Sequence, residues 1–213
     1  MNGHLIELGA EAASAGLVSA SCGNASVRRG PASILITGSG CELGRLTELD
    51  LTEVNLKGEV LRGPRPSCEL EMHLEVFRAC PKAQAILHTH APWSTLMACM
   101  KEPVQALDFI VEIPLFVGSH ATVPFHPPGS RELALAVGQA FREPGVHLAQ
   151  MRNHGQLAVG QTWREALHRV ILFERACWMA LQGHELERLP SHRCPTLHDN
   201  GALEPACKGY QRA

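Results

Sequence analysis

The 213-residue chain lacks the marks of several large protein classes. It has no apolar run long enough to cross a bilayer, so we expect it not to span a membrane. Its 19 Lys and Arg residues against 21 Asp and Glu residues give a net charge of −2, which offers no basic surface for nucleic acid or anionic lipid. No two of its eight cysteines have the two-residue spacing of a zinc ribbon or a redox dithiol.

The first residues, MNGHLIELGAEAASAG, also lack the basic segment and long apolar stretch of a secretory leader. Scattered cysteines in a chain of this length are typical of a reduced protein and not of a disulfide scaffold. We therefore expect a cytoplasmic protein that acts on small molecules, without a nucleic acid or membrane partner.

The hydrophobic pattern predicts one α/β domain over residues 1–185, followed by a tail over residues 186–213 that is flexible or contacts another subunit. No repeat or linker divides the body. Apolar residues at helical spacing predict helices over residues 4–16, 67–80, 92–100, 131–143 and 162–182. Alternating and β-branched runs predict strands within residues 22–40, 46–63, 84–91 and 147–160, and loops with short strands over 103–130.

Two histidines, His88 and His90, close the apolar run AIL. On a strand, residues two apart share a face, so these side chains are expected to lie side by side. Such a pair alone is more often structural than metal-binding. It gains weight from Glu69, at the start of a predicted helix, and His154, in a turn before a glycine, because sites are usually built where strands open into loops.

Three imidazoles and a carboxylate suit Zn²⁺, with Mn²⁺, Co²⁺ or Fe²⁺ as alternatives. Such an ion acts as a Lewis acid on a carbonyl group, and a carboxylate that leaves the ion is free to transfer protons.

Five short motifs, taken in order, resemble the class II aldolase/adducin-like family, and L-fuculose-phosphate aldolase most closely. The resemblance runs over residues 4–183. The motifs are GNASVR (23–28), ITGSG (36–40), PSCE (66–69) with His73 one helical turn beyond, HTHA (88–91) and NHG (153–155).

The resemblance implies a mostly antiparallel sheet covered by helices on both faces, and a homotetramer with its sites between subunits. It makes His88, His90 and His154 the metal ligands. Glu69 becomes the acid/base that also ligates the metal in the empty enzyme. The phosphate pocket of the family falls on Asn24, Ser39, Gly40, Ser67 and Cys68. Backbone N–H groups at glycine turns and at a helix start are suited to such an anion.

Two positions depart from the family. Cys68 stands where fuculose-phosphate aldolases have serine, and a thiol is a weak donor. The phosphate is then held less strongly or by the backbone alone, or the substrate carries a carboxylate or no anion at this place. Phe109 stands at the position of the tyrosine that protonates the aldehyde oxygen. The candidates to replace that tyrosine are Asp108, His126 and Tyr210, the chain's only tyrosine.

The resemblance implies a metal-dependent aldolase that cleaves a ketose 1-phosphate, such as L-fuculose 1-phosphate, to dihydroxyacetone phosphate and an aldehyde through a metal-stabilised enediolate. A decarboxylase or epimerase of a related sugar or hydroxy/keto acid is the alternative on the same site. A non-enzymatic scaffold of the adducin type is a remote alternative, because such domains lose the site whereas this chain keeps all four predicted ligands. His73 is interpreted as a hydrogen-bonded helix histidine, or else as a partner of Glu69.

Overall fold

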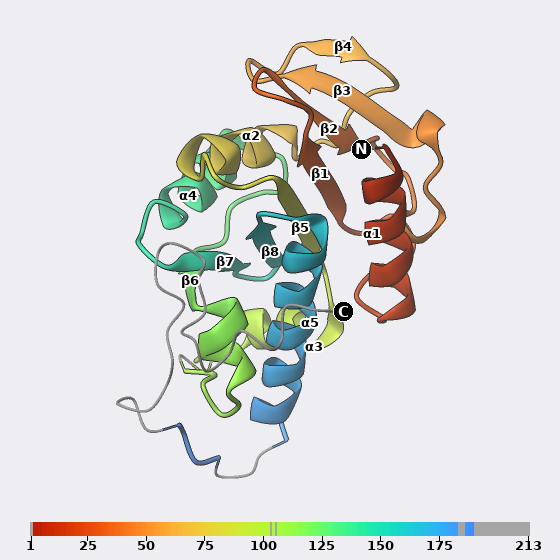
Figure 1. Ribbon diagram of the computed structural model, residues 1–213. Helices are drawn as coiled ribbons and strands as arrows, with labels where there is room; N and C mark the ends of the chain where they lie inside the picture. Colours follow the sequence, from red (N-terminus) through yellow and green to blue (C-terminus); the bar gives the residue numbers. More distant parts are fainter. Residues whose placement is uncertain (1, 103, 105, 183–185, 190–213) are drawn as a thin grey trace, which may run out of the picture.

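The computed structural model describes residues 2–102, 104, 106–182 and 186–189, which form an eight-stranded sheet with helices on both faces (Figure 1). The strands are β1 (Asn24–Arg28), β2 (Ser33–Thr37), β3 (Leu51–Asn55), β4 (Val60–Arg62), β5 (Ala85–Thr89), β6 (Ser119–Val123), β7 (Val146–Met151) and β8 (Gly155–Gly160). The helices are α1 (Asn2–Ser14), α2 (Leu70–Ala79), α3 (Pro92–Cys99), α4 (Arg131–Ala140) and α5 (Trp163–Ala180). Short 3₁₀ turns lie at Leu43–Arg45 and Glu48–Asp50.

The strands follow the order β4-β3-β2-β1-β5-β8-β7-β6 across the sheet. Neighbouring strands are antiparallel except β6 and β7, which are parallel. β5 therefore lies inside the sheet, where His88 is opposite Asn24 of β1 and Leu157 of β8. This arrangement confirms the expected mostly antiparallel sheet with helices on both faces.

Alternate residues of the inner strands face two separate hydrophobic cores. In β5, Leu87 faces the core covered by α1, α3 and α5, whereas Ile86 faces the core covered by α2 and α4. Figure 1 shows these two groups of helices on opposite sides of the sheet. His88 continues the Ile86 face, so the strand directs this histidine toward α2.

The start of α2 differs from the prediction. The sequence predicts a helix from residue 67, but α2 begins at Leu70. The N–H of Ser67 donates to the carbonyl of Thr37 at 3.0 Å, and this pairing holds the preceding residues extended. Glu69 therefore takes the N-cap position, immediately before the helix and not within it.

Side-chain caps fix the start of α4 where the sequence predicts it and the start of α5 one residue later, at Trp163. The hydroxyl of Ser130 accepts from the N–H of Leu133, and that of Thr162 accepts from the N–H of Glu165. Both caps satisfy N–H groups that have no partner within the helix itself.

The segment over residues 103–130 was expected to hold only loops and short strands. Its described part contains β6 but also a π-helical turn, Ile113–Val117, whose two end residues are buried under α5. Of the predicted tail, only residues 186–189 are described; Arg188 lies against Asp108 there, and the N–H of Leu189 donates to the Asp108 carbonyl at 2.9 Å. The boundary at residue 185 stays a prediction.

None of the described helices is long and apolar enough to cross a membrane. The cysteines within the described ranges are all free thiols.

Candidate metal centre

His88 and His90 lie side by side at the end of β5. Their ring centroids are 4.8 Å apart, and the two Nε2 atoms are 3.0 Å apart. His88 is fully buried, and its Nδ1 lies 2.8 Å from the backbone carbonyl of Gln156 in the next strand. Because a carbonyl only accepts, Nδ1 carries the proton, and Nε2 presents a lone pair to the site.

The turn between β7 and β8 brings His154 to the same place. Its ring centroid is 4.9 Å from that of His88 and 4.8 Å from that of His90, so the three rings form a nearly equilateral triangle. Asn153 adopts a left-handed conformation with φ of 54°. At Gly155 a Cβ would lie 2.4 Å from the Thr89 carbonyl oxygen, so only glycine fits this close approach. Both flanking residues of the NHG motif are thus explained by the turn that places His154.

The Glu69 carboxylate completes the cluster. Its Oε2 lies 3.1 Å from Nε2 of His88, and its Oε1 lies 3.4 Å from Nε2 of His154. Glu69 is almost fully buried, and its Oε1 makes no hydrogen bond within the described part of the chain. The structure thus brings all four predicted ligands together.

The donor atoms of this cluster fit a cation. The ligand nitrogens of the three histidines lie within 4.8 Å of one another. The Nε2 of His88 faces both a second imidazole nitrogen and a carboxylate oxygen at about hydrogen-bond distance, so atoms that carry lone pairs face one another. A divalent ion between them satisfies all of these lone pairs at once, and imidazole with carboxylate is a usual zinc donor set.

Burial and mutual charge determine the protonation of the cluster. Burial lowers the pKa of His90 and of His154 to about 4, and the neighbouring His88 lowers both further in the same direction. Burial also acts to lower the pKa of His88, but the Glu69 carboxylate outweighs it and raises that pKa. Burial acts to raise the pKa of Glu69, but His88 and the hydrogen bond from Asn24 bring it well below its ordinary value. Glu69 is therefore ionised, and His90 and His154 are neutral near pH 7, as metal ligands must be.

Asn24, predicted to bind phosphate, has its side chain between Glu69 and His73. Its Nδ2 donates to Glu69 Oε2 at 2.9 Å, and its Oδ1 lies 2.6 Å from Nε2 of His73. The other ring nitrogen of His73 lies 2.6 Å from the hydroxyl of Ser26. His73 is thus a fully hydrogen-bonded buried histidine, as preferred from the sequence, and it reaches Glu69 only through Asn24. The role of Ser26 was not foreseen, because it depends on which residues of β1 face α2.

The other predicted anion-binding residues lie on two adjacent segments. Gly38 pairs with Pro66 in an isolated β-bridge, and the N–H of Ser39 donates to the Arg65 carbonyl at 2.9 Å. Ser39, Gly40 and Cys68 are exposed, whereas Ser67 is buried with its hydroxyl accepting from the N–H of Glu69 at 3.2 Å. The structure therefore brings these four positions together next to Glu69.

The candidates for the missing tyrosine lie in different surroundings. Phe109 packs against the core beneath α1 and α5. Its neighbour Asp108 forms two hydrogen bonds with Arg188, at 2.7 and 2.9 Å, and these bonds lower the pKa of Asp108, so it is ionised and has no proton to give near pH 7. Tyr210 lies outside the described residues.

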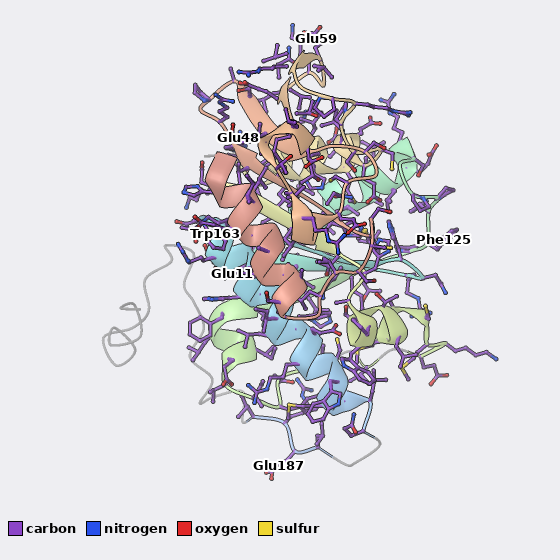
Figure 2. The ribbon with its side chains drawn as sticks, turned by 90° about the vertical axis from the view of Figure 1, so that its right-hand side faces the viewer. Glu11, Glu48, Glu59, Phe125, Trp163 and Glu187 are labelled. Atoms are coloured by element: carbon purple, nitrogen blue, oxygen red, sulfur yellow. The ribbon has the colours of Figure 1, made fainter. Side chains whose placement is uncertain are left out.

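His126 lies on the loop between β6 and α4, next to Phe125, whose 55% exposed ring projects from the molecule in Figure 2. A Cβ on Gly129 of this loop would lie 3.0 Å from the carbonyl oxygen of Cys68. The loop that carries His126 therefore contacts the predicted anion-binding segment.

A hollow of about 480 Å³ lies between the end of α2, the loop before β7 and the start of α5. Cys80, Lys82 and Arg169 are among the residues that line it, and none of the predicted site residues does. It is therefore separate from the histidine cluster.

Comparison with known proteins agrees with this geometry. The family model described as "Class II Aldolase and Adducin N-terminal domain" matches residues 3–181. A 5-methylthioribulose-1-phosphate/5-deoxyribulose-1-phosphate aldolase of Rhodospirillum rubrum is 32% identical over 195 residues, which cover 88% of this chain and 84% of the relative. A 3-oxo-tetronate 4-phosphate decarboxylase of Haemophilus influenzae is 27% identical and covers 92% of this chain and 95% of its own.

Among solved structures, an L-fuculose 1-phosphate aldolase superposes with a TM-score of 0.79 at 28% identity, covering 90% of this chain and 91% of the other. The model match spans most of the chain, and the fold and the sequence motifs agree with it. The chain belongs to the class II aldolase and adducin N-terminal domain family.

Proposed function

We propose that the protein is a metal-dependent aldolase that cleaves a ketose 1-phosphate, of the L-fuculose 1-phosphate kind, to dihydroxyacetone phosphate and an aldehyde. One observation carries this proposal. An ionised carboxylate, Glu69, and three imidazoles converge on one buried point from three separate segments of the chain. A domain that served only as a scaffold would not need these buried polar groups, which are costly unless a cation binds them.

His88, His90 and His154 are the proposed ligands of a Zn²⁺ ion, with Glu69 as a fourth ligand when no substrate is bound; Mn²⁺, Co²⁺ and Fe²⁺ are the alternatives. The ion supplies a Lewis acid that stabilises negative charge on a substrate oxygen. Glu69 then transfers the proton, and its Oε1, which has no hydrogen-bond partner among the described residues, is the atom best placed to do so.

The phosphate of the substrate is proposed to lie against Ser39, Gly40, Ser67 and Cys68. Their segments are paired through Gly38 and Pro66, and the first N–H groups of α2 follow directly. Anions are favoured at such helix starts. Asn24 stays a predicted contact, because one N–H of its amide is used by Glu69 and an amide nitrogen has two.

Decarboxylation of a 3-oxo acid phosphate is the second candidate. It is favoured by the surroundings of Phe109 and Asp108, which leave His126 as the proposed group that takes up the hydroxyl proton when cleavage forms the aldehyde. Loss of carbon dioxide forms no aldehyde and needs no such group. His126→Gln is therefore expected to slow cleavage of a ketose 1-phosphate strongly and to leave a decarboxylation nearly unchanged.

The experiment that tests the function begins with metal analysis of the purified protein. A screen follows with ketose 1-phosphates, 5-methylthioribulose 1-phosphate, 3-oxo-tetronate 4-phosphates and unphosphorylated 3-oxo acids, each with Zn²⁺ and with chelator. We expect one divalent ion per chain and turnover of a phosphorylated substrate that chelator abolishes. His90→Ala should lose both, and the exposed-histidine control His168→Ala neither. A protein that binds no divalent metal, or a His90→Ala variant as active as the wild type, would overturn the proposal.

A further inference from the structure

Four buried polar side chains form a continuous hydrogen-bonded line that ends at the candidate metal centre. It runs from the hydroxyl of Ser26 to Nδ1 of His73 (2.6 Å), from Nε2 of His73 to Oδ1 of Asn24 (2.6 Å), and from Nδ2 of Asn24 to Oε2 of Glu69 (2.9 Å). Ser26 and His73 are fully buried, and Asn24 and Glu69 are 7% and 4% exposed. Water therefore does not compete for these bonds.

The charge of Glu69 fixes the direction of every bond in the line. A carboxylate only accepts, so the Asn24 amide must present its N–H to Glu69 and its carbonyl oxygen to His73. That oxygen also accepts, so Nε2 of His73 carries the ring proton. Nδ1 is then bare and accepts from Ser26. Burial lowers the pKa of His73 to about 3, which agrees with this neutral tautomer.

The backbone explains why the line exists. Asn24 and Ser26 are two residues apart on β1 and share a face of the sheet. Glu69 and His73 are four apart, and the N–H of His73 donates to the Glu69 carbonyl at 3.3 Å in the first turn of α2. Three hydrogen bonds between β1 and the start of α2 thus fix the position of the first turn of α2 on the strand.

We propose that His73 and Asn24 are positioning residues, which hold the Glu69 carboxylate against the three-histidine cluster, and that the Ser26 hydroxyl supports the required tautomer of His73 by donating to its bare Nδ1. The proposal rests on the proposed function, since it takes Glu69 to act at a metal ion. It assigns Asn24 a role besides the predicted phosphate contact: one N–H orients the acid/base, and the second faces no described partner and stays available to the substrate.

Two amide substitutions at one position separate this role from simple packing. Glutamine at residue 73 places an amide near the position of Nε2 and keeps a donor for Asn24. Asparagine places its amide near the position of Nδ1 and cannot reach Asn24. Both remove the ring and both remain polar. The measurements are the dissociation constant for Co²⁺ by calorimetry and the visible absorption spectrum of the Co²⁺ protein, which reports the ligand set, alongside urea unfolding of the metal-free protein.

We expect His73→Gln to keep the wild-type Co²⁺ spectrum and an affinity within about threefold. His73→Asn should weaken Co²⁺ binding about 10–100-fold, as is typical of lost support for a metal ligand, and shift the spectrum toward that of Glu69→Gln. In the double variant His73→Asn/Glu69→Gln the second change should add nothing further. If His73→Asn does not fold, Asn24→Ser, which removes the same amide, replaces it.

The outcomes distinguish the two proposals. Co²⁺ binding that survives His90→Ala would overturn the proposed metal centre itself. If His90→Ala abolishes binding and Glu69→Gln alters the spectrum, but His73→Asn and Asn24→Ser match the wild type, the positioning role is wrong. Equal losses in His73→Gln and His73→Asn would also overturn it, because the donor to Asn24 would then not be what matters.

Discussion

Gly155 is the position with least room beside the candidate site, since an added Cβ would meet both the Thr89 carbonyl and, at 3.0 Å, Cδ2 of His90. We expect Gly155→Ala to lower the free energy of unfolding by about 1–3 kcal/mol, the usual cost of overpacking, and to weaken Zn²⁺ binding by displacing the His90 ring. Urea unfolding and calorimetric titration measure the two effects. Gly3→Ala in α1, where an added Cβ meets no atom within 4 Å, is the control and should leave Zn²⁺ binding unchanged without lowering the free energy of unfolding.

The buried His73 makes the stability of the metal-free protein depend on pH. Its pKa is about 3 when folded and about 6.5 when unfolded, so at pH values between these the unfolded chain binds a proton that the folded chain does not. The free energy of unfolding therefore falls as the pH falls below 6.5. Between pH 7.5 and 5.5, His73→Gln should gain about 1.4 kcal/mol relative to the wild type in urea unfolding.

His168→Gln, at an exposed histidine, serves as the control for that series. A difference between His73→Gln and wild type that stayed constant with pH would mean that the pKa of His73 is the same in the folded and the unfolded protein.

Single residues illustrate how far the sequence predicts the site. The four proposed ligands could be identified because each lies in a short local motif: PSCE for Glu69, HTHA for His88 and His90, and NHG for His154. The hydrogen bonds of Asn24 could not be identified, because they depend on the register between β1 and β5 and on the docking of α2. The structural role of Glu174 was not predicted either. This glutamate interrupts the apolar stripe of α5, and a charged residue at such a position indicates a buried charge that has a partner.

The partner of Glu174 is the start of α3, a helix that is held at both ends by groups of complementary charge. At its start, the N–H groups of Trp93 and Ser94 donate to the Glu174 carboxylate at 2.7 and 2.8 Å. At its end, Arg152 donates to the Met100 carbonyl. Negative charge at a helix start and positive charge at its end are the favourable arrangement. α3 follows His90 almost directly, and Arg152 lies two residues before His154, so this helix connects two of the proposed ligands.

We predict that Glu174→Gln destabilises the protein by about 1–3 kcal/mol, because the replacement presents an N–H to an N–H and loses the charge. Zn²⁺ binding should weaken in parallel, since the start of α3 anchors His90. Urea unfolding and hydrogen exchange at the Trp93 amide measure the effect. Glu11→Gln, at an exposed glutamate of α1 labelled in Figure 2, is the matched control and should stay within about 0.5 kcal/mol. A variant as stable as this control would contradict the anchoring role.

Helices and strands were predictable where local chemistry decides them. The starts of α4 and α5 agree with their cap residues because a cap acts within one turn. The predicted start of α2 was three residues too early. The backbone of Ser67 pairs with Thr37, which is distant in sequence, and this pairing keeps the residues before Glu69 out of the helix. The π-helical turn Ile113–Val117 has no comparable local mark in the sequence.

For the molecule as a whole, a bound ion would connect segments that are far apart in the chain, and only the folded chain presents them together. We expect metal to raise the free energy of unfolding by about 2.7 kcal/mol when free Zn²⁺ is at 100 times its dissociation constant. Thermal unfolding with chelator and with increasing Zn²⁺ measures this increment. His90→Ala should remove it, and an unfolding midpoint insensitive to Zn²⁺ in the wild type would contradict it.

Assembly is the other property of the whole molecule, and we predict a homotetramer with its sites near the subunit interfaces. Trp93 and Leu96 of α3 are 40% and 50% exposed directly after His90, and such apolar surface beside a site suits a second subunit. Light scattering should give four times the 23.1 kDa of one chain. Leu96→Glu should yield smaller species, whereas Leu49→Glu, at an 86% exposed leucine in the 3₁₀ turn Glu48–Asp50, should not. A wild-type monomer would contradict the prediction.

The order of strands was not predictable from hydrophobic pattern, and it has a consequence for how the protein is made. β5 pairs with β1 before it and with β8 long after it. A chain growing on the ribosome already contains Glu69, His88 and His90 when His154 and the Gln156 carbonyl that orients His88 have not been synthesised. Such long-range pairing is slow to form. The metal centre is therefore completed late in biosynthesis, and metal captured earlier would lack the His154 ligand.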